Sequence, residues 1–261
     1  MRLDAFLVEK GFFDTRSKAT NAIKRGEVFV NGVKAEKPSK ETAENDAISI
    51  LAEKAFVSVG GFKLDKALEE FGVDCKGRVF ADIGASTGGF TDALLKRGAK
   101  TVFAVDVGKD LLDESLKNDP RVVVMDGVNA RYLTENDFSL PLDGAVVDCS
   151  FISIRLILPT LVPIVKGGTV IALIKPQFEC GGEALSKNGL LLGEDEQKKV
   201  VSSVYGFCKE LGLGITGFTH APLFKKKNVE YLAEIGHSDS GLTESELMNA
   251  VASAYKEWRG L

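Results

Sequence analysis

The chain has 261 residues, of which 44% are hydrophobic, and its formal net charge at pH 7 is −4. This length suits one large domain and a small one, and the hydrophobic content is ordinary for a globular protein with a sizeable core. The four cysteines form no C-x-x-C pair, which argues against a zinc site or a disulfide framework and favours a reducing compartment. No apolar run suits a signal peptide or a membrane span, so we expect a cytoplasmic protein that makes no membrane contact.

The first 40 residues carry a positive excess within a chain that is negative as a whole, with nine Lys or Arg against five Asp or Glu. Two short helices are predicted over residues 2–10 and 15–25, with Gly11 between them and Gly26 as the C-terminal stop of the second. Residues 27–34 then contain an Asn-Gly pair between two short apolar runs, which is a strong signal for a β-hairpin with a type I′ turn. The sequence therefore predicts a small α-α-β-β unit that faces a polyanion.

The stretch RLDAFLVEKGFFDTRSKATNAIKRGEVFVNGVKAEKP, which begins at Arg2, resembles the small RNA-binding module named after ribosomal protein S-four. The resemblance covers residues 2–50, so we expect this α+β domain over 1–51, a linker over 52–59 and a second domain over 60–261. It implies that four cations meet RNA phosphates: Arg16, Lys18, Lys24 and Arg25. From the residues alone, the alternative is a charged face that is only solvated.

Helices and strands alternate through the rest of the chain, which predicts an α/β domain with a mostly parallel sheet. Strands are expected over 78–81, 101–106, 122–125, 144–148, 169–174, 215–220 and 229–235. Helices are expected from residue 60, near 110–117, and over 153–165, 194–211 and 243–258. The last two strands follow each other with no helix between them, which predicts an antiparallel hairpin at one edge of the sheet.

A glycine-rich turn, ADIGASTGGFT at residues 81–91, follows the first of these strands. Its glycines let the backbone bend sharply and approach a ligand, and the next strand ends in Asp106 about 20 residues later, where open α/β sheets hold a ribose. The spacing is D-x-G-x-x-x-G-G and departs from the dinucleotide fingerprint G-x-G-x-x-G. The alternative is a turn that only packs the strand against a helix.

This turn resembles the first motif of S-adenosylmethionine-dependent methyltransferases, which implies a Rossmann-like fold and S-adenosylmethionine as the cofactor. By the same resemblance, Asp106 would bind the ribose hydroxyls, for which a carboxylate is well suited. Asp126 or Asn129 would lie near the adenine. The residues implied around the methionine moiety are Gly84, Ser86, Gly88, Gly89 and Phe90.

Four further charged residues lie at the ends of predicted elements, facing the same crevice: Lys63, Asp148, Lys175 and Glu230. Taken separately, each is equally well explained as a member of a surface ion pair. Together they resemble the Lys-Asp-Lys-Glu set of FtsJ-like ribose 2′-O-methyltransferases. With the segments GGFKL, DIGASTGGFTDALL, DCSFIS and KPQFE, nearly the whole chain resembles the TlyA haemolysin/rRNA methyltransferase family.

The family resemblance implies an enzyme that methylates a ribose 2′-hydroxyl of ribosomal RNA, with cytidine as the expected nucleotide and ribosomal subunits as partners. Lys175 would be the general base or would position the hydroxyl, with Lys63 as its electrostatic partner and the two carboxylates as orienting groups. Two alternatives remain open: an inactive protein that binds RNA through the same fold, and a cytolysin, as the family's haemolysin name implies. The absence of a predicted membrane span argues against the cytolysin.

Three local features qualify these expectations. Cys149 follows Asp148 without the Pro-Cys context of cytosine-C5 methyltransferases, and strand alternation should turn it away from the crevice. Val59 stands where the family usually has an arginine. The lysine run 225–227 replaces a segment that is often glycine-rich, and it either adds positive charge at an RNA entrance or forms a solvated loop.

Overall fold

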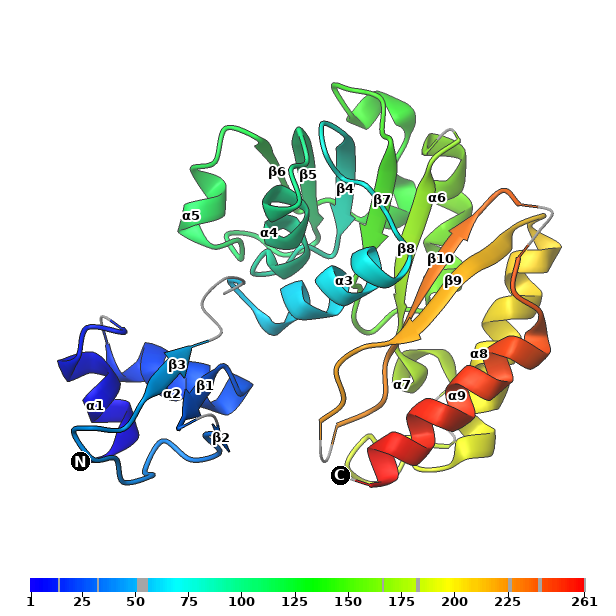
Figure 1. The fold of residues 1–261 in the computed structure, drawn as a ribbon. Helices are drawn as coiled ribbons and strands as arrows, with labels where there is room; N and C mark the ends of the chain where they lie inside the picture. The colour runs from blue at the N-terminus through cyan, green and yellow to red at the C-terminus, as the bar shows by residue number, and fades with distance from the viewer. Residues whose placement is uncertain are drawn as a thin grey trace. The chain divides into compact units, whose positions relative to one another are not determined.

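The computed structural model describes residues 1–13, 15–31, 33–50, 56–165, 167–181, 184–224, 227–238 and 241–260, and the chain forms two compact units, Met1–Ala55 and Phe56–Leu261 (Figure 1). Phe56 is buried in the larger unit, where its ring meets that of Phe62 edge-on at 5.0 Å. The structure therefore places Phe56 with the large unit, although the sequence predicts a linker over 52–59. The other predicted domain bounds stay predictions.

The small unit contains two helices and a three-stranded antiparallel sheet in the order β2-β1-β3. Thr15 caps the second helix through the Lys18 N–H, and Gly26 ends it with φ 77°. The third strand was not predicted, because it is short and pairs with the first across a long polar connection. The elements are α1 Leu3–Glu9, α2 Arg16–Arg25, β1 Val28–Val30, β2 Val33–Lys34 and β3 Ile48–Ile50.

The large unit is built on a seven-stranded sheet in the order β6-β5-β4-β7-β8-β10-β9 (Figure 1). All neighbouring strands are parallel except β10, which runs antiparallel to both β8 and β9. This arrangement confirms the predicted Rossmann-like α/β fold with an antiparallel edge hairpin. The strands are β4 Val79–Ile83, β5 Thr101–Asp106, β6 Val122–Asp126, β7 Gly144–Val147, β8 Thr169–Ile174, β9 Gly214–His220 and β10 Tyr231–Gly236.

Helices cover both faces of the sheet, so the central strands are buried and mostly apolar, with Asp82 in β4 as an exception. In β5, Val102 and Ala104 pack with α3 and α4, whereas Phe103 and Val105 pack on the opposite face, in the core that contains residues of α6, α8 and α9. No helix in the described ranges is long and apolar enough to cross a bilayer. The α-helices are α3 Val59–Glu70, α4 Gly89–Lys96, α5 Glu114–Lys117, α6 Leu158–Ile164, α7 Pro176–Glu179, α8 Glu194–Glu210 and α9 Glu244–Arg259, and the 3₁₀ helices are η2 Ala130–Tyr132, η3 Glu135–Asp137 and η4 Ile154–Leu156.

Most predicted elements differ from the structure by one or two residues at their ends, and three differences bear on the site. The helix expected near 110–117 is limited to α5, because the preceding loop is held by a hydrogen bond from the Asp110 N–H to Asp126 Oδ2. The helix expected over 153–165 is divided into η4 and α6, and Pro159 lies in the first turn of the second helix, where its missing N–H costs least. Glu230, expected inside a strand, lies just before β10.

Candidate active site

The strand order reverses between β4 and β7, and ligands of open α/β sheets bind beyond the carboxyl ends of such strands. After β4 the chain turns at Gly84, which has φ 80°. A Cβ at Gly84 would lie only 2.9 Å from the Asp148 carbonyl oxygen, so glycine lets the ends of β4 and β7 approach each other. The turn thereby brings the glycine-rich segment against the segment that carries Asp148.

The next two glycines in the turn make room for neighbouring parts of the protein. A Cβ at Gly88 (φ 94°) would lie 2.2 Å from a methyl of Leu116, and one at Gly89 would lie 2.2 Å from Ser58 Oγ. Gly88 does not line either of the two pockets described next, whereas Gly89 and Phe90 line the second. Packing therefore explains Gly88, and its predicted contact with a cofactor stays a prediction.

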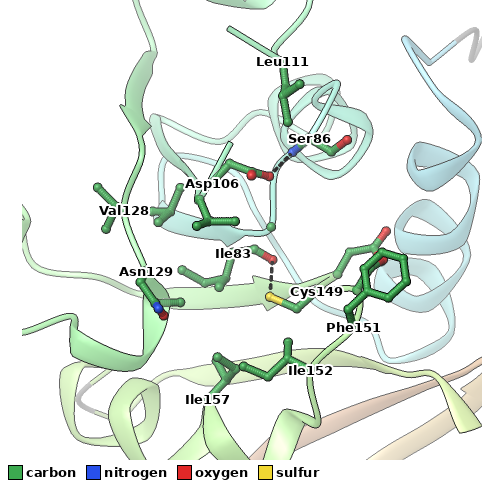
Figure 2. A pocket seen from close by; sticks show the side chains of 16 residues that line it. Ile83, Ser86, Asp106, Leu111, Val128, Asn129, Cys149, Phe151, Ile152 and Ile157 are labelled. Atoms are coloured by element: carbon green, nitrogen blue, oxygen red, sulfur yellow. Dashed lines mark hydrogen bonds between the residues drawn. The ribbon is translucent and has the colours of Figure 1, made fainter. Parts of the chain in front are cut away.

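The first pocket, of about 440 Å³, opens beside the end of β5 and has mainly apolar walls that include Ile83, Leu111 and Val128 (Figure 2). Asp106 lies on one side, where its two carboxylate oxygens accept the Ser86 N–H at 2.8 Å and the Gly108 N–H at 2.7 Å. These bonds fix the carboxylate and leave each oxygen able to accept a further hydrogen bond. Asn129 lines the pocket, but Asp126, whose carboxylate holds the 110 loop, does not.

Cys149 also lines the first pocket, which contradicts the prediction that it turns away (Figure 2). The strand ends at Val147, so strict strand alternation no longer governs the direction of the side chain. The thiol donates a hydrogen bond to the Ile83 carbonyl at 3.7 Å, and burial raises the pKa of Cys149 to about 12. A thiol that stays protonated at neutral pH is a poor nucleophile.

The second pocket, of about 210 Å³, lies next to the first and shares Gly84, Ser86, Asp148 and Ser150 with it. The four predicted charged residues form two ion pairs, and three of these residues, Lys63, Asp148 and Lys175, line this pocket. Lys63 Nζ lies 2.5 Å from Glu230 Oε2, with both side chains 18% exposed. Lys175 Nζ lies 2.5 Å from Asp148 Oδ1, and the Lys175 side chain is only 8% exposed. The structure thus brings together all four residues from segments far apart in the sequence.

Ser150 is a site residue that the sequence did not single out, although it belongs to the DCSFIS segment. Its Oγ accepts a hydrogen bond from Lys175 Nζ at 2.9 Å, and the Asp148 carbonyl lies 3.5 Å from the same nitrogen. Together with the Asp148 carboxylate, these oxygens surround the ammonium group, which has three N–H donors. Ser150 therefore fixes where the Lys175 ammonium points.

The third pocket, of about 690 Å³, is called the outer groove below. It shares Val59 and Lys63 with the second pocket, and Glu230 also lines it. Further lining residues come from the segments 188–190, 221–224 and 227–228. The four charged residues consequently lie between the first pocket, at the carboxyl ends of the central strands, and the outer groove, whose walls are of mixed polarity.

A buried carboxylate lies beneath the glycine turn. Asp82 is fully buried, and its Oδ2 accepts a hydrogen bond from the Thr91 hydroxyl at 2.6 Å. Within the described part of the chain, its other oxygen has no hydrogen-bond partner. Burial raises the pKa of Asp82 to about 7, with the nearby Asp148 and Asp106 charges acting in the same direction.

In the small unit, Arg16, Lys18 and Lys24 are exposed on α2, and the side chain of Arg25 lies outside the described part of the chain. Arg16 is held by the buried Asp4 at 2.9 Å, and Arg2 contacts the same carboxylate. The hydrogen bond from Arg2, together with Arg16, keeps the pKa of Asp4 well below its usual range. Contacts of these cations with RNA phosphates stay a prediction.

Comparisons with known proteins match both units. A family model described as FtsJ-like methyltransferase matches residues 56–233, and one described as S4 domain matches residues 1–48. The 16S/23S rRNA (cytidine-2′-O)-methyltransferase TlyA of Mycobacterium tuberculosis is 39% identical over 261 residues, covering 98% of this chain and 97% of that protein. Hemolysin A of Brachyspira hyodysenteriae is 39% identical over 236 residues, covering 89% and 98%. A solved structure described as a hemolysin from Streptococcus thermophilus is 38% identical, covers 100% of this chain and 97% of its own, and has a TM-score of 0.76. The chain therefore belongs to the FtsJ-like methyltransferase family and carries an S4 domain ahead of the methyltransferase domain.

Proposed function

We propose that this protein is an S-adenosylmethionine-dependent methyltransferase that methylates the ribose 2′-hydroxyl of a cytidine in ribosomal RNA, acting in the cytoplasm on ribosomal subunits. The observation that carries the proposal is the convergence of Lys63, Asp148, Lys175 and Glu230 between the first pocket and the outer groove. Two relatives, from Mycobacterium tuberculosis and Campylobacter jejuni, are named rRNA (cytidine-2′-O)-methyltransferases, which supports the substrate.

The first pocket suits S-adenosylmethionine. Asp106 offers two fixed carboxylate oxygens for the ribose hydroxyls, and apolar walls with Asn129 suit the adenine. The sulfonium would supply a methyl group that is already activated. We infer that Gly84, Ser86 and Asp106 contact the cofactor directly, with Gly89 and Phe90 nearer its reactive end.

We assign two roles to the charged residues: they align the ribose 2′-hydroxyl with the methyl group, and they assist the loss of its proton. In-line transfer needs the 2′-oxygen fixed opposite the methyl group, and the second pocket is small enough to hold only the reacting groups. Lys175 is held by Asp148 and Ser150 and is aimed at this space. We assign Lys175 to relay the proton of the hydroxyl: its ammonium passes a proton to the paired Asp148 carboxylate, and the neutral amine so formed accepts the hydroxyl proton as the oxygen takes the methyl group. The pair of Lys63 and Glu230 is assigned to orient the ribose from the groove side.

The test is methyl transfer to ribosomal subunits from a strain that lacks the gene, followed by nuclease digestion and mass spectrometry of the RNA. A 2′-O-methylcytidine supports the proposal. A methyl group on a base would overturn the assigned chemistry, and subunit binding without any transfer would favour the alternative of an inactive binding protein. Lys198→Ala serves as a lysine control, because the ion pair of Lys198 with Glu194 lies on the surface of α8 and outside the three pockets.

A further inference from the structure

We propose that the outer groove binds the nucleotide next to the methylated one, with its base stacked on Phe224 and its phosphate near Lys227. This inference rests on the proposed function, because it takes RNA as the acceptor. It assigns an RNA subsite to a groove that Lys63 and Glu230 border and that shares no lining residue with the first pocket.

The first step of the inference is continuity. The second pocket measures about 210 Å³ and the outer groove about 690 Å³, and they share Val59 and Lys63. An RNA strand whose 2′-hydroxyl enters the second pocket must continue past it. The first pocket is assigned to the cofactor, so the groove is the described hollow that remains next to Lys63 for the rest of the strand.

The second step is the chemistry of the groove walls. Phe224 lines the groove with 40% of its surface exposed, so part of its side chain is open to a ligand in the groove. The backbone N–H of Lys227 donates a hydrogen bond to the Phe224 carbonyl at 3.2 Å, which keeps these two residues close together. An aromatic face beside a cation fits an unpaired nucleotide, which offers a base to stack and a phosphate to neutralise.

The third step is that the opposite wall is already ordered. Residues 185–191 form a small hairpin, closed by a bridge between Leu185 and Leu191. Asn228 clamps this hairpin, because its Oδ1 accepts the Leu191 N–H at 2.8 Å and its Nδ2 donates to the Gly189 carbonyl at 2.9 Å. The wall that carries Asn188, Gly189 and Leu190 is therefore held from a residue only two positions before Glu230.

Buried hydrogen bonds of Gln197 also hold this hairpin, on the side that faces the sheet. Gln197, only 1% exposed, donates to the Leu191 carbonyl at 3.3 Å and accepts a hydrogen bond from the Tyr231 hydroxyl. Tyr231 is the first residue of β10, so the groove wall is tied to the sheet itself. A wall that is fixed before binding loses little conformational entropy when the nucleotide enters, which suits recognition in a defined register.

The experiment compares Phe224→Ala and Phe224→Trp with the wild-type enzyme in methyl transfer to unmodified ribosomal subunits. Loss of one stacked base should raise the KM for subunits about 10-fold for Phe224→Ala, with kcat and the Kd for S-adenosylmethionine within about twofold of wild type, and Phe224→Trp should restore the KM. Lys227→Ala should reduce the salt dependence of subunit binding by about one phosphate contact. Leu211→Ala is the matched control, since Leu211 is similarly exposed, at 37%, and does not line the groove.

The outcomes separate this inference from the proposed function. An unchanged KM in Phe224→Ala, or an equal effect in Leu211→Ala, would overturn the groove assignment while wild-type activity still supports the methyltransferase. If the wild-type protein methylates no RNA, the proposed function fails. Direct binding of subunits then decides the groove: weaker binding by Phe224→Ala supports it, and equal binding overturns it.

Discussion

The first pocket and the outer groove flank the same four charged residues, but they are built in different ways. The first pocket is formed by the ends of neighbouring parallel strands, and backbone hydrogen bonds such as that from the Gly84 N–H to the Val105 carbonyl fix it. The outer groove is formed by segments near residues 59, 189 and 224, and the side chain of Asn228 holds one of its walls. The cofactor side thus belongs to the sheet, whereas the acceptor side is added to it.

This difference suggests a division of labour within one scaffold. A wall made of strand ends cannot move without disturbing the core, so it suits a ligand that is the same in every reaction. A hairpin held by a few side-chain bonds can change in sequence while the sheet stays intact, so it suits recognition of a particular acceptor. Variants on the cofactor side should therefore change the Kd for S-adenosylmethionine, and variants on the acceptor side should change the KM for ribosomal subunits.

The largest effect is expected at the boundary between the two sides. Lys175→Ala should lower kcat about 1,000-fold, because the acceptor hydroxyl loses the group that holds it and handles its proton. The Kd values for S-adenosylmethionine and for subunits should change by less than about threefold, since Lys175 is assigned to neither binding wall. Single-turnover transfer and calorimetry measure these quantities, and a wild-type rate would show that the site is misassigned.

On the cofactor side, Asp106→Asn should weaken S-adenosylmethionine binding about 30-fold, since one charged acceptor for a ribose hydroxyl is lost. The KM for subunits should stay the same. Asp119→Asn is a control on a carboxylate that pairs with Arg121 and does not line the first pocket. A change in the KM for subunits as large as that in the cofactor Kd would break the proposed separation of the two sides.

On the cofactor side, the buried Asp82 should make the free energy of unfolding depend on pH. The pKa of Asp82 in the folded protein, about 7, lies above the ordinary value of 3.8, so the folded state binds a proton that the unfolded state has released. Stability from this group is present at low pH and is lost as the pH rises through about 7. Between pH 5 and pH 7 the wild type should lose about 2 kcal/mol of unfolding free energy relative to Asp82→Asn.

Urea unfolding of both proteins at the two pH values gives this difference. The Asn side chain keeps an oxygen that accepts from Thr91, so the variant preserves the observed hydrogen bond. Parallel stability curves for the two proteins would mean that Asp82 is ionised in the folded state at pH 5.

The sequence predicted the cofactor side better than the acceptor side, and the reason is locality. A strand, a glycine turn and a carboxylate at the end of the next strand lie within 26 residues, from Ala81 to Asp106, so their spacing encodes their arrangement. The hairpin over 185–191 owes its position to Asn228, which lies 37 residues beyond Leu191 in the chain. Neither this clamp nor the short strand β3 has a local pattern.

The sequence also did not indicate that Asp82 is fully buried. Asp82 was taken only as part of the turn motif, but its isolation follows from the packing of helices on both faces of the sheet. The four charged residues were found because the family resemblance assigned them together, and the structure adds that they form two ion pairs. The cation on α2 at Arg16 was predicted as an RNA contact without its internal partner Asp4.

The smallest effect is expected at Ser150, which lines both the first and the second pocket and so tests where the cofactor side ends. Ser150→Ala removes one acceptor from the Lys175 ammonium, which keeps its contacts with Asp148, and kcat should fall about 10-fold. Ser150→Thr keeps the hydroxyl and should recover most of the rate. If the loss appears in the Kd for S-adenosylmethionine and not in kcat, Ser150 acts on the cofactor, and the boundary between the two sides lies at Lys175 itself.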